Sequence, residues 1–373
     1  MRVRRSPRRS GLRVIPHSQA VGRAVDPGHP EHGAASLTSG GIRVLHVGCG
    51  RRAKAHLKAQ LSSGQYLLAG LCDVNGVRAR ELAASMRLAD THAFEDPVEA
   101  CTALQPELVV LAIPPQSRPE LVRALVSAGC PAVLVEKPIA LTPSDLADLQ
   151  EIGRSTPVFV NTQYRWMPHW RKLLRYVGAG WLGELAEVRL STRFAPFEQG
   201  EHVISLGLEI ASLAGVPAPR WVLAAACGIE RHGPRETPAE LIAVAGLGAA
   251  RMHLVHGAVA PLVRGDEDAP WNALVVHARG TEGWLDVTVN KGYTLVSGVR
   301  RLEGATEWYR DDESAQRSLY IDLAGWLRGP RTESFPTAVE SASAASGFLF
   351  AAERSARTRQ RVSLLTDSGP TTQ

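Results

Sequence analysis

The tripeptide EKP, residues 136–138, places Lys137 directly after the apolar run AVLVE. A lysine at the carboxyl end of a buried strand lies at the edge of a parallel sheet where ligands bind. Pro138 restricts Lys137 to extended backbone, so the starting point of the side chain is fixed. From there the ammonium can donate a proton to a substrate heteroatom while hydride reaches the neighbouring carbon. The alternative is a solvated turn lysine that pairs with Glu136.

A second set of residues has the spacing of a dinucleotide site. Gly48 and Gly50 follow the apolar run IRVLHV, and Ala53 follows shortly after. In such a turn the first glycine permits the tight bend, the second lets a pyrophosphate approach, and the third small residue packs helix against strand. The free amides at the helix start then face the phosphates. A tight turn without a ligand is the alternative.

Asp73 ends the next predicted strand, 25 residues after Gly48. An acidic side chain there accepts hydrogen bonds from the adenine ribose hydroxyls and repels a 2′-phosphate, which favours NAD. Arg51, Arg52 and Arg78 have the opposite effect, because they can neutralise a 2′-phosphate. The cofactor prediction is therefore NAD(P)H with a preference for NAD, and a helix-capping role for Asp73 stays open.

These residues need a sheet that brings strand ends together. Apolar runs predict strands over residues 42–48, 66–73, 107–114, 131–136 and 157–161. Between them the sequence predicts helices over residues 51–61, 76–86, 97–104, 118–129 and 143–153. Strands and helices that alternate in this way imply right-handed crossovers. We expect a doubly wound parallel sheet, an α/β Rossmann domain, over residues 41–160.

After residue 160 the pattern changes. All eight tryptophans lie in this second half, and several segments alternate as antiparallel strands do. We expect a C-terminal α+β domain over residues 161–365 with an open, predominantly antiparallel sheet. Residues 280–283, GTEG, predict a hairpin turn. His253 and His256 lie three apart on a predicted strand, which points them to opposite faces and argues against a shared metal.

Charge and composition exclude several classes of partner. The net charge of +5 comes from residues 1–40, where seven arginines face two acidic residues, and the rest of the chain is balanced. This gives no reason to expect nucleic acid or a membrane surface. Residues 1–40 are predicted to be a disordered basic tail and residues 366–373 a second tail. The five cysteines have no paired metal-ligand spacing, which favours a reducing compartment, the cytoplasm.

The glycine turn, the segment AIPP that ends near Pro114, and the EKP tripeptide together resemble the Gfo/Idh/MocA-type oxidoreductase family. The resemblance implies that Glu136 and Pro114 border the cofactor, that Lys137 lies in the active site, and that the second domain carries substrate contacts and often a dimer interface. A homodimer is therefore expected. The chain departs from the family at Arg118, where many members have histidine.

A further departure lies in the second half. Many sugar-acting members carry a D-x-x-x-H-x-x-D pattern on the helix that leads the second domain. The corresponding positions for the histidine and the last aspartate are Ser205 and Leu208, and His202 is displaced by three residues. The proton relay of a sugar dehydrogenase is therefore expected to be broken.

Residues 161–174 and 270–298 are similar to the thiazolinyl imine reductases, a branch of this family. The branch reduces the C=N bond of a thiazoline, held on a peptidyl carrier protein, in siderophore-type nonribosomal peptide synthesis. Its proposed acid is a tyrosine that matches Tyr164, and a histidine there occupies the position of Lys137. The resemblance implies that Tyr164 and Lys137 are catalytic and that no metal takes part.

We expect the Lys137 ammonium to lower the pKa of the Tyr164 phenol and so make it a better acid. Asn161, Gln163 and His202 are candidate substrate contacts, and core packing is an equal alternative for Asn161 and Gln163. Trp166 and Trp170 are candidates for an apolar wall, although tryptophans are more often core.

Two competing functions remain open. The first is a sugar or cyclitol dehydrogenase of the same fold, which the EKP lysine supports and the missing histidine opposes. The second is a catalytically silent dinucleotide-sensing protein that regulates a partner. That reading predicts tight cofactor binding without turnover.

Overall fold

In a computed structural model we describe residues 40–364, apart from residues 89–90, 117, 233–234 and 262–272. The two predicted tails, except for Gly40, and Ser117, the predicted start of a helix, lie outside this part. Both sheets described below belong to the same compact unit of the chain.

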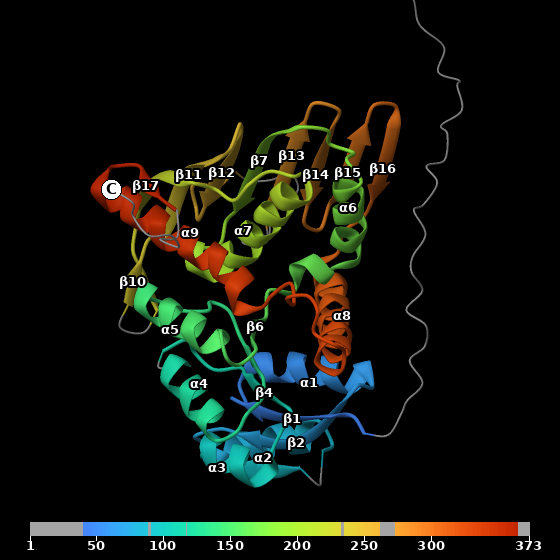
Figure 1. Ribbon diagram of the computed structural model, residues 1–373, viewed down its shortest axis with the longest axis vertical. Coiled ribbons are helices and arrows are strands. Elements are labelled where there is room, and N and C mark those ends of the chain that lie inside the picture. Colours follow the sequence, from blue (N-terminus) through green and yellow to red (C-terminus); the bar gives the residue numbers. More distant parts are fainter. Residues whose placement is uncertain (1–39, 89–90, 117, 233–234, 262–272, 365–373) are drawn as a thin grey trace, which may run out of the picture. The chain divides into compact units, whose positions relative to one another are not determined.

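The first sheet consists of six parallel strands in the order β3-β2-β1-β4-β5-β6 (Figure 1). The strands are β1 (Ile42–Val47), β2 (Tyr66–Cys72), β3 (His92–Phe94), β4 (Leu108–Leu111), β5 (Val133–Val135) and β6 (Val158–Val160). Every residue of β4, β5 and β6 is buried, as expected for a sheet covered on both faces. The predicted doubly wound fold is confirmed.

Five helices connect these strands: α1 (Arg51–Ser63), α2 (Gly76–Ser85), α3 (Pro97–Leu104), α4 (Arg118–Ser127) and α5 (Pro143–Gly153). Local sequence explains their ends. The side chains of Asn75, Asp96 and Thr142 accept hydrogen bonds from backbone amides in the first turns of α2, α3 and α5. Helix α1 ends at Gly64, which adopts the left-handed conformation at φ 67°.

The strand order places the candidate residues at one edge. Strand β1 pairs with β2 on one side and with β4 on the other, so the connections leave in opposite directions there. A crevice opens at the carboxyl ends of strands at such a switch point. Gly48 follows β1, Asp73 follows β2, Pro114 lies just after β4, and Lys137 lies just after β5.

The second sheet has nine strands in the order β16-β15-β14-β13-β7-β12-β11-β8-β17. Neighbouring strands are antiparallel except β7 and β12, which confirms the predominantly antiparallel prediction. The strands are β7 (Leu185–Thr192), β8 (Trp221–Cys227), β11 (Glu240–Leu247), β12 (Ala250–His256), β13 (Leu274–Gly280), β14 (Gly283–Thr288), β15 (Gly292–Ser297), β16 (Arg300–Gly304) and β17 (Val362–Ser363). Strands β9 (Glu230–His232) and β10 (Arg235–Thr237) pair separately.

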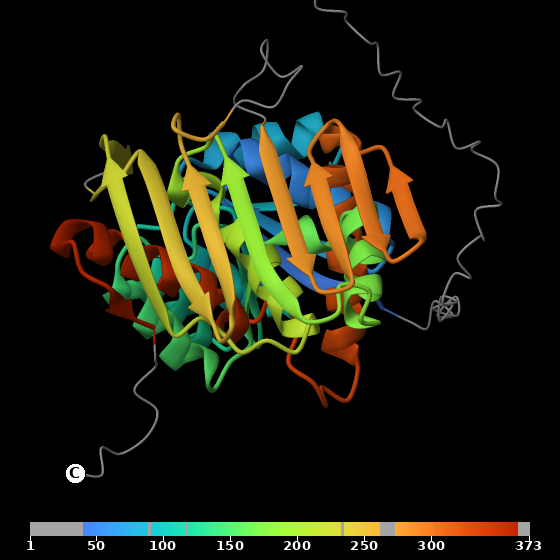
Figure 2. The same ribbon diagram turned by 90° about the horizontal axis from the view of Figure 1, so that it is seen from above.

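Helices cover one face of the second sheet, and Figure 2 looks onto the other face, on which no helix of the described chain lies. The remaining helical segments are η1 (Gln163–Trp166), α6 (Pro168–Gly178), α7 (Pro196–Leu213), α8 (Trp308–Arg328) and α9 (Val339–Thr358). Helix α7 packs closely on the sheet, because a Cβ atom at Gly207 would lie 2.8 Å from Leu190 and 3.2 Å from Met252.

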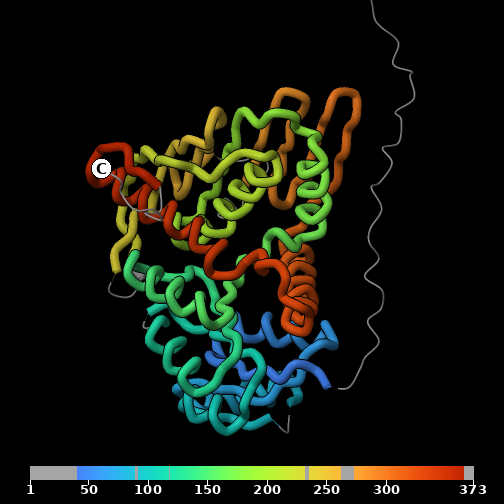
Figure 3. The backbone as a smooth tube through the Cα atoms, viewed as in Figure 1, coloured from blue at the N-terminus to red at the C-terminus, as the bar shows by residue number. Residues whose placement is uncertain are grey.

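Helix α8 returns to the first sheet and lies beside α1 (Figure 3). The Tyr66 hydroxyl on β2 donates a hydrogen bond of 2.8 Å to the backbone carbonyl of Tyr320 on α8. The last third of the chain therefore completes the surroundings of the first helix.

Several smaller predictions are also tested. The hairpin at residues 280–283 is confirmed, because β13 and β14 pair as antiparallel neighbours. On β12 His256 is buried while His253 is half-buried, and no cluster of three metal-ligating side chains occurs among the described residues. Strand β3 was not predicted, because its three residues are largely exposed and carry no apolar run. No helix of the described chain combines the length and apolarity needed to cross a bilayer.

Candidate functional site

Gly48 makes the turn that leads from β1 into α1. Its backbone has φ +92°, and its amide donates a hydrogen bond of 2.8 Å to the carbonyl of Cys72 at the end of β2. A Cβ atom here would lie 2.5 Å from the carbonyl oxygen of Ala112, which follows β4. Only glycine fits this position, because both the conformation and the space exclude a side chain.

Gly50 and the start of α1 leave space for a ligand to approach the backbone amides. Gly50 is the N-cap of α1, no side chain caps the helix, and a Cβ atom at Gly50 would meet nothing within 4 Å. Uncapped amides at a helix start bind anions. Ala53 is fully buried, as the packing role requires. These residues fit the pyrophosphate of a dinucleotide, and Pro114 is exposed on the neighbouring strand end.

Asp73 is held against the glycine turn. One carboxylate oxygen accepts a hydrogen bond of 2.8 Å from the Cys49 amide, and the other accepts one of 2.9 Å from the Asn75 amide. The capping of α2 is performed by Asn75. Because each carboxylate oxygen has two lone pairs, Asp73 retains acceptor capacity for hydroxyl groups beside the turn.

The three arginines near the turn differ. Arg51 and Arg78 are exposed. Arg52 turns away, since its Nε donates a hydrogen bond of 3.0 Å to Glu136 and its Nη1 lies 4.0 Å from Asp312 on α8. Arg52 is thus committed to carboxylates and is unsuited to neutralise a 2′-phosphate.

Glu136 is the centre of a buried polar cluster. Its Oε1 accepts hydrogen bonds from Arg52, from His56 at 2.8 Å and from Asn161 at 2.8 Å. Burial alone would raise the pKa of Glu136, but the hydrogen bond and charge of His56 and the charge of Arg52 hold it well below its usual value. Its other oxygen accepts the backbone amide of Lys137 at 3.1 Å.

The cluster continues onto α8, and sequence reasoning missed this half. His56 Nδ1 lies 2.6 Å from the Tyr320 hydroxyl, and the Gln316 side chain exchanges two hydrogen bonds with Asn161. Gln163 donates a hydrogen bond of 2.7 Å to Asp312. Asn161 and Gln163 thus bond to side chains of α8, and the substrate role considered for both stays a prediction.

Lys137 points away from Glu136. The residue is half-buried, and its Nζ donates a hydrogen bond of 2.5 Å to the backbone carbonyl of Glu198 in the first turn of α7. Burial lowers the pKa of Lys137, although the nearby Glu136 and Glu201 act in the opposite direction. The side chain is thus neither freely solvated nor paired through its ammonium with Glu136.

Tyr164 lies close by and is almost fully buried. Its hydroxyl donates a hydrogen bond of 2.8 Å to Gln199, the residue after the acceptor of Lys137. Its ring stacks on His202 with centroids 4.0 Å apart, and Trp308 packs edge-on at 4.9 Å. Lys137 and Tyr164 are thus both anchored to the start of α7.

The expected lowering of the Tyr164 pKa is wrong. Burial, followed by the charge of Asp312, raises the pKa of Tyr164 well above its usual value. The loss of hydration outweighs any nearby cation when a phenol lies inside the protein. For the same reason the pKa of His202 is lowered well below its usual value, by burial first and then by the Lys137 charge. His202 is therefore neutral.

Arg118 and Glu201 fix the loop that carries Lys137. The fully buried Arg118 guanidinium donates to the carbonyls of Ile139 at 2.9 Å, Ile113 at 2.8 Å, and Pro138. Burial lowers the pKa of Arg118 to about 10. Glu201 accepts the Ile139 amide at 3.1 Å, and burial raises the pKa of Glu201. In the sequence, an arginine in place of the family's histidine marks position 118 as unusual, but it does not reveal these hydrogen bonds.

The tryptophans considered for a substrate wall belong to the core. Trp166 and Trp170 are 3% and 1% exposed. The Trp166 indole donates a hydrogen bond of 2.8 Å to Asp322 on α8.

Comparison with known families gives one match. Residues 42–164 match the Gfo/Idh/MocA family, described as an oxidoreductase family with an NAD-binding Rossmann fold. The matched segment contains every residue discussed above from the glycine turn to Tyr164. No curated protein matches the chain.

Solved structures share the fold over most of the chain. An oxidoreductase from Agrobacterium radiobacter in complex with NAD+, L-tartaric acid and magnesium has 15% identity and a TM-score of 0.74, covering 87% of this chain and 99% of its own. The WlbA dehydrogenase from Bordetella pertussis in complex with NADH and UDP-GlcNAcA has 20% identity and a TM-score of 0.67, covering 88% and 100%.

A third structure with this fold is a super-repressor mutant of Gal80p from Saccharomyces cerevisiae. It has 15% identity and a TM-score of 0.71, covering 87% of this chain and 98% of its own. At such identities the likeness concerns the fold alone.

Proposed function

We propose that the chain, whose residues 42–164 match an oxidoreductase family with an NAD-binding Rossmann fold, is an NAD-dependent oxidoreductase that reduces the C=N bond of a cyclic imine. The most concrete substrate is a thiazoline bound to a peptidyl carrier protein, which becomes a thiazolidine. The observation that supports this is the common anchoring of Lys137 and Tyr164 to Glu198 and Gln199. One ammonium and one phenol at the same helix start suit a nitrogen that must gain a proton.

The reduced nicotinamide supplies the hydride when it is bound. The turn at Gly48 and the uncapped start of α1 would hold its pyrophosphate, and Asp73 would accept its ribose hydroxyls, which favours NAD over NADP. Lys137 would lie on the same edge of the sheet, after β5.

The pKa directions assign the proton to Lys137. A lowered pKa makes its ammonium a stronger acid than an ordinary lysine, so it protonates the imine nitrogen. Tyr164 remains a protonated phenol, because its pKa is raised. Its proton is donated to Gln199, so its oxygen would accept a hydrogen bond from the ring N–H once Lys137 has protonated that nitrogen. Neutral His202 supports the Tyr164 ring by stacking. These roles reverse the expectation from the sequence, in which Tyr164 donates the proton and Lys137 lowers the pKa of Tyr164.

A thiazoline-loaded carrier protein tests this proposal. Incubation with NADH or NADPH is expected to give a mass gain of two hydrogens, and the Lys137→Met variant is expected to give none within the same time. The proposal fails if the native protein binds the cofactor but leaves the thiazoline unchanged.

A sugar or cyclitol dehydrogenase is the second candidate. The EKP lysine favours it, and Ser205 and Leu208 at the positions of the family's histidine and aspartate oppose it. Turnover of a polyol panel with NAD would select it. The third candidate, a silent dinucleotide sensor, predicts tight NAD(H) binding, no oxidation with any imine or carbonyl, and undisturbed partner binding after Lys137→Ala.

The proposed setting is cytoplasmic, with a carrier protein as substrate partner and a second copy of the chain as structural partner. The face of the second sheet shown in Figure 2 supports the homodimer, because half-exposed Leu223 on β8 and Ile242 on β11 are diagonal neighbours on the side of the sheet opposite buried Val222 and Leu241. Exposed apolar side chains on an uncovered sheet are typical of an interface.

A further inference from the structure

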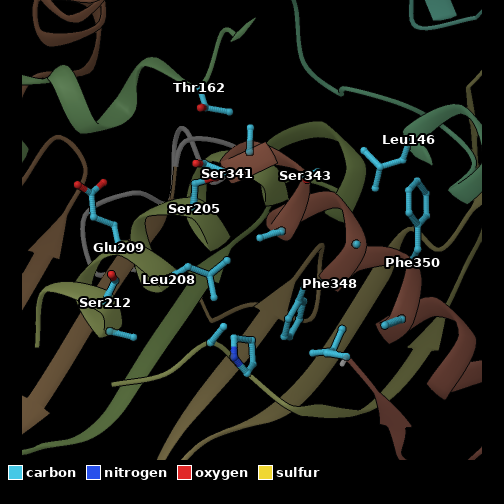
Figure 4. Close-up of a pocket in the computed structure, with 18 of the residues that line it drawn as sticks. Leu146, Thr162, Ser205, Leu208, Glu209, Ser212, Ser341, Ser343, Phe348 and Phe350 are labelled. Atoms are coloured by element: carbon cyan, nitrogen blue, oxygen red, sulfur yellow. The ribbon is translucent and has the colours of Figure 1, made fainter. Parts of the chain in front are cut away.

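A large groove runs along α9 beyond the residues discussed so far (Figure 4). Its volume is about 1190 Å³, and its lining comes from α5, η1, α7, α9 and β17. We call it the α7–α9 groove. Tyr164 and His202 belong to its lining, whereas Gly48, Asp73 and Lys137 do not. The groove therefore meets the candidate site at its aromatic side chains and is separate from the dinucleotide crevice.

Small residues of α9 keep the groove open. Ser341, Ala344, Gly347 and Ala351 line it and are spaced three or four apart, so they lie on one face of the helix. A Cβ atom at Gly347 would meet nothing within 4 Å. Space at this position is therefore available to a ligand.

Three buried polar atoms in the lining have no hydrogen-bond partner within the described chain: His202 Nδ1, Thr337 Oγ1 and Arg235 Nε. His202 and Thr337 are each only 3% exposed. A buried polar atom without a partner is destabilising. Thr337 lies just before α9 and its backbone carbonyl accepts the Val160 amide, while His202 stacks on Tyr164 of η1. A ligand with polar groups beside these two residues would satisfy their unpaired atoms.

The far end of the groove is positively charged. Within the lining Arg165 pairs with Glu209, and Arg235 pairs with Glu353, both at 2.6 Å. Arg354 and Arg357 are exposed and form no ion pair in the described part of the chain. They lie about 20–24 Å along α9 from Ser341, at 1.5 Å per residue. Glu340 lies at the opposite end, so the groove is electrically polarised.

We propose that the α7–α9 groove binds the non-reacting arm of the substrate, a long and mostly apolar chain with an anionic group at its far end. The reacting end would then meet Tyr164 and His202, and the anion would meet Arg354 and Arg357. The identity of the reacting end, a cyclic imine, rests on the proposed function. The volume exceeds the roughly 300–1,000 Å³ of ordinary ligand pockets, so a single cyclitol would leave most of it empty.

Calorimetric titration of the full-length protein with dodecyl phosphate tests the groove without cofactor or turnover. Saturable binding is expected, together with a loss of at least tenfold in affinity in the double variant Arg354→Gln, Arg357→Gln. Dodecanol is expected to bind both proteins equally. Both substitutions are on the surface, so this comparison does not depend on tolerance of the core. Equal binding of dodecyl phosphate by both proteins, or equally tight binding of inorganic phosphate, overturns the proposal.

A matched pair of glycine variants tests the position of the arm. Gly347→Leu is expected to fill the groove and lower the affinity for dodecyl phosphate at least tenfold. Gly325→Leu is the control, because Gly325 on α8 also has nothing within 4 Å of its Cβ position but does not line the groove. The proposal is overturned if folded Gly347→Leu binds as the native protein does, or if both variants lose affinity alike.

The titration separates this inference from the proposed function. If the protein binds dodecyl phosphate in the expected way but reduces no imine, the groove proposal stands and the imine reductase proposal fails. If the protein reduces a small cyclic imine but does not bind dodecyl phosphate as expected, the imine reductase proposal stands and the groove proposal fails.

Discussion

At the scale of single residues, burial shifts the pKa values of Lys137 and Tyr164 more than neighbouring charges do, whereas at Glu136 the neighbouring His56 and Arg52 outweigh burial. Lys137 has a lowered pKa despite the carboxylates of Glu136 and Glu201, and Tyr164 has a raised one. Both shifts favour the neutral form, as desolvation requires. The Lys137 ammonium is therefore a better proton donor than the Tyr164 phenol.

The pH dependence of reduction follows from this order. If the Lys137 ammonium is the acid, kcat/KM is high below its pKa and is lost as pH rises through it, at a pH below that of an ordinary lysine. The check is a pH–rate profile of the native protein and of Tyr164→Phe, which keeps the stacking on His202. Tyr164→Phe should lower the rate yet retain the basic limb. A limb that vanishes in this variant would instead make the phenol the acid.

At the scale of elements, the ends of four strands, β1, β2, β4 and β5, position the site. The turn after β1 touches the residue after β4 through Gly48, and Arg118 on α4 ties the loop after β4 to the loop after β5. Neither contact involves a regular hydrogen bond of the sheet. The geometry of the edge therefore depends on a few specific residues.

Gly48→Ala is expected to abolish dinucleotide binding, because the methyl group would lie 2.5 Å from the Ala112 carbonyl at a positive φ. Fluorescence titration with NADH measures the effect. Gly64→Ala is the matched control: it also has positive φ, but nothing lies within 4 Å of its Cβ position. It should lose about 1 kcal/mol of stability and bind NADH normally. Normal binding by Gly48→Ala would contradict the assigned role of this turn.

Arg118→Met is expected to lower the free energy of unfolding by about 3 kcal/mol, because three carbonyl groups lose a buried donor. Urea denaturation measures the change. Arg123→Met on the same helix is the control, because its 3.2 Å pair with Asp148 is exposed and its loss should cost less than about 1 kcal/mol. Similar losses in the two variants would show that Arg118 does not hold the loops.

At the scale of the whole molecule, the periodic segments were predictable and the long-range contacts were not. The strand and helix pattern, the caps at Asn75, Asp96 and Thr142, and the glycine turn follow from local sequence. The outer half of the Glu136 cluster does not, because Gln316 and Tyr320, which bond to Asn161 and His56, come from a helix about 180 residues later in the chain than Glu136. Nor does local sequence report burial, which is why the pKa of Tyr164 was predicted in the wrong direction.

Acid should destabilise the whole fold through buried histidines. Burial lowers the pKa of His46 to about 3 and those of His169 and His256 to about 4. Between these values and about 6.5 the unfolded chain binds protons that the folded chain does not, so stability falls as pH falls through this window. Urea denaturation from pH 7 to pH 4 measures the slope, and His256→Leu should flatten it. An unchanged slope in that variant would refute the contribution of His256.

The homodimer proposal predicts that the native protein has twice the mass of the chain in light scattering and that Ile242→Asp is monomeric. A charge on an apolar interface costs several kcal/mol when it is desolvated. Val299→Asp is the control, because Val299 is fully exposed in the turn between β15 and β16 rather than on the open face. A monomeric native protein would refute the proposal.

The return of α8 to α1 has a consequence for biosynthesis. A ribosome delivers Arg52 and His56 long before it delivers Gln316 and Tyr320, which complete their hydrogen bonds. Until that late helix emerges, the polar side chains of α1 face water, and the loop bearing Lys137 lacks part of its support through Glu136. The nascent chain therefore acquires the complete set of contacts around the candidate site only near the end of translation.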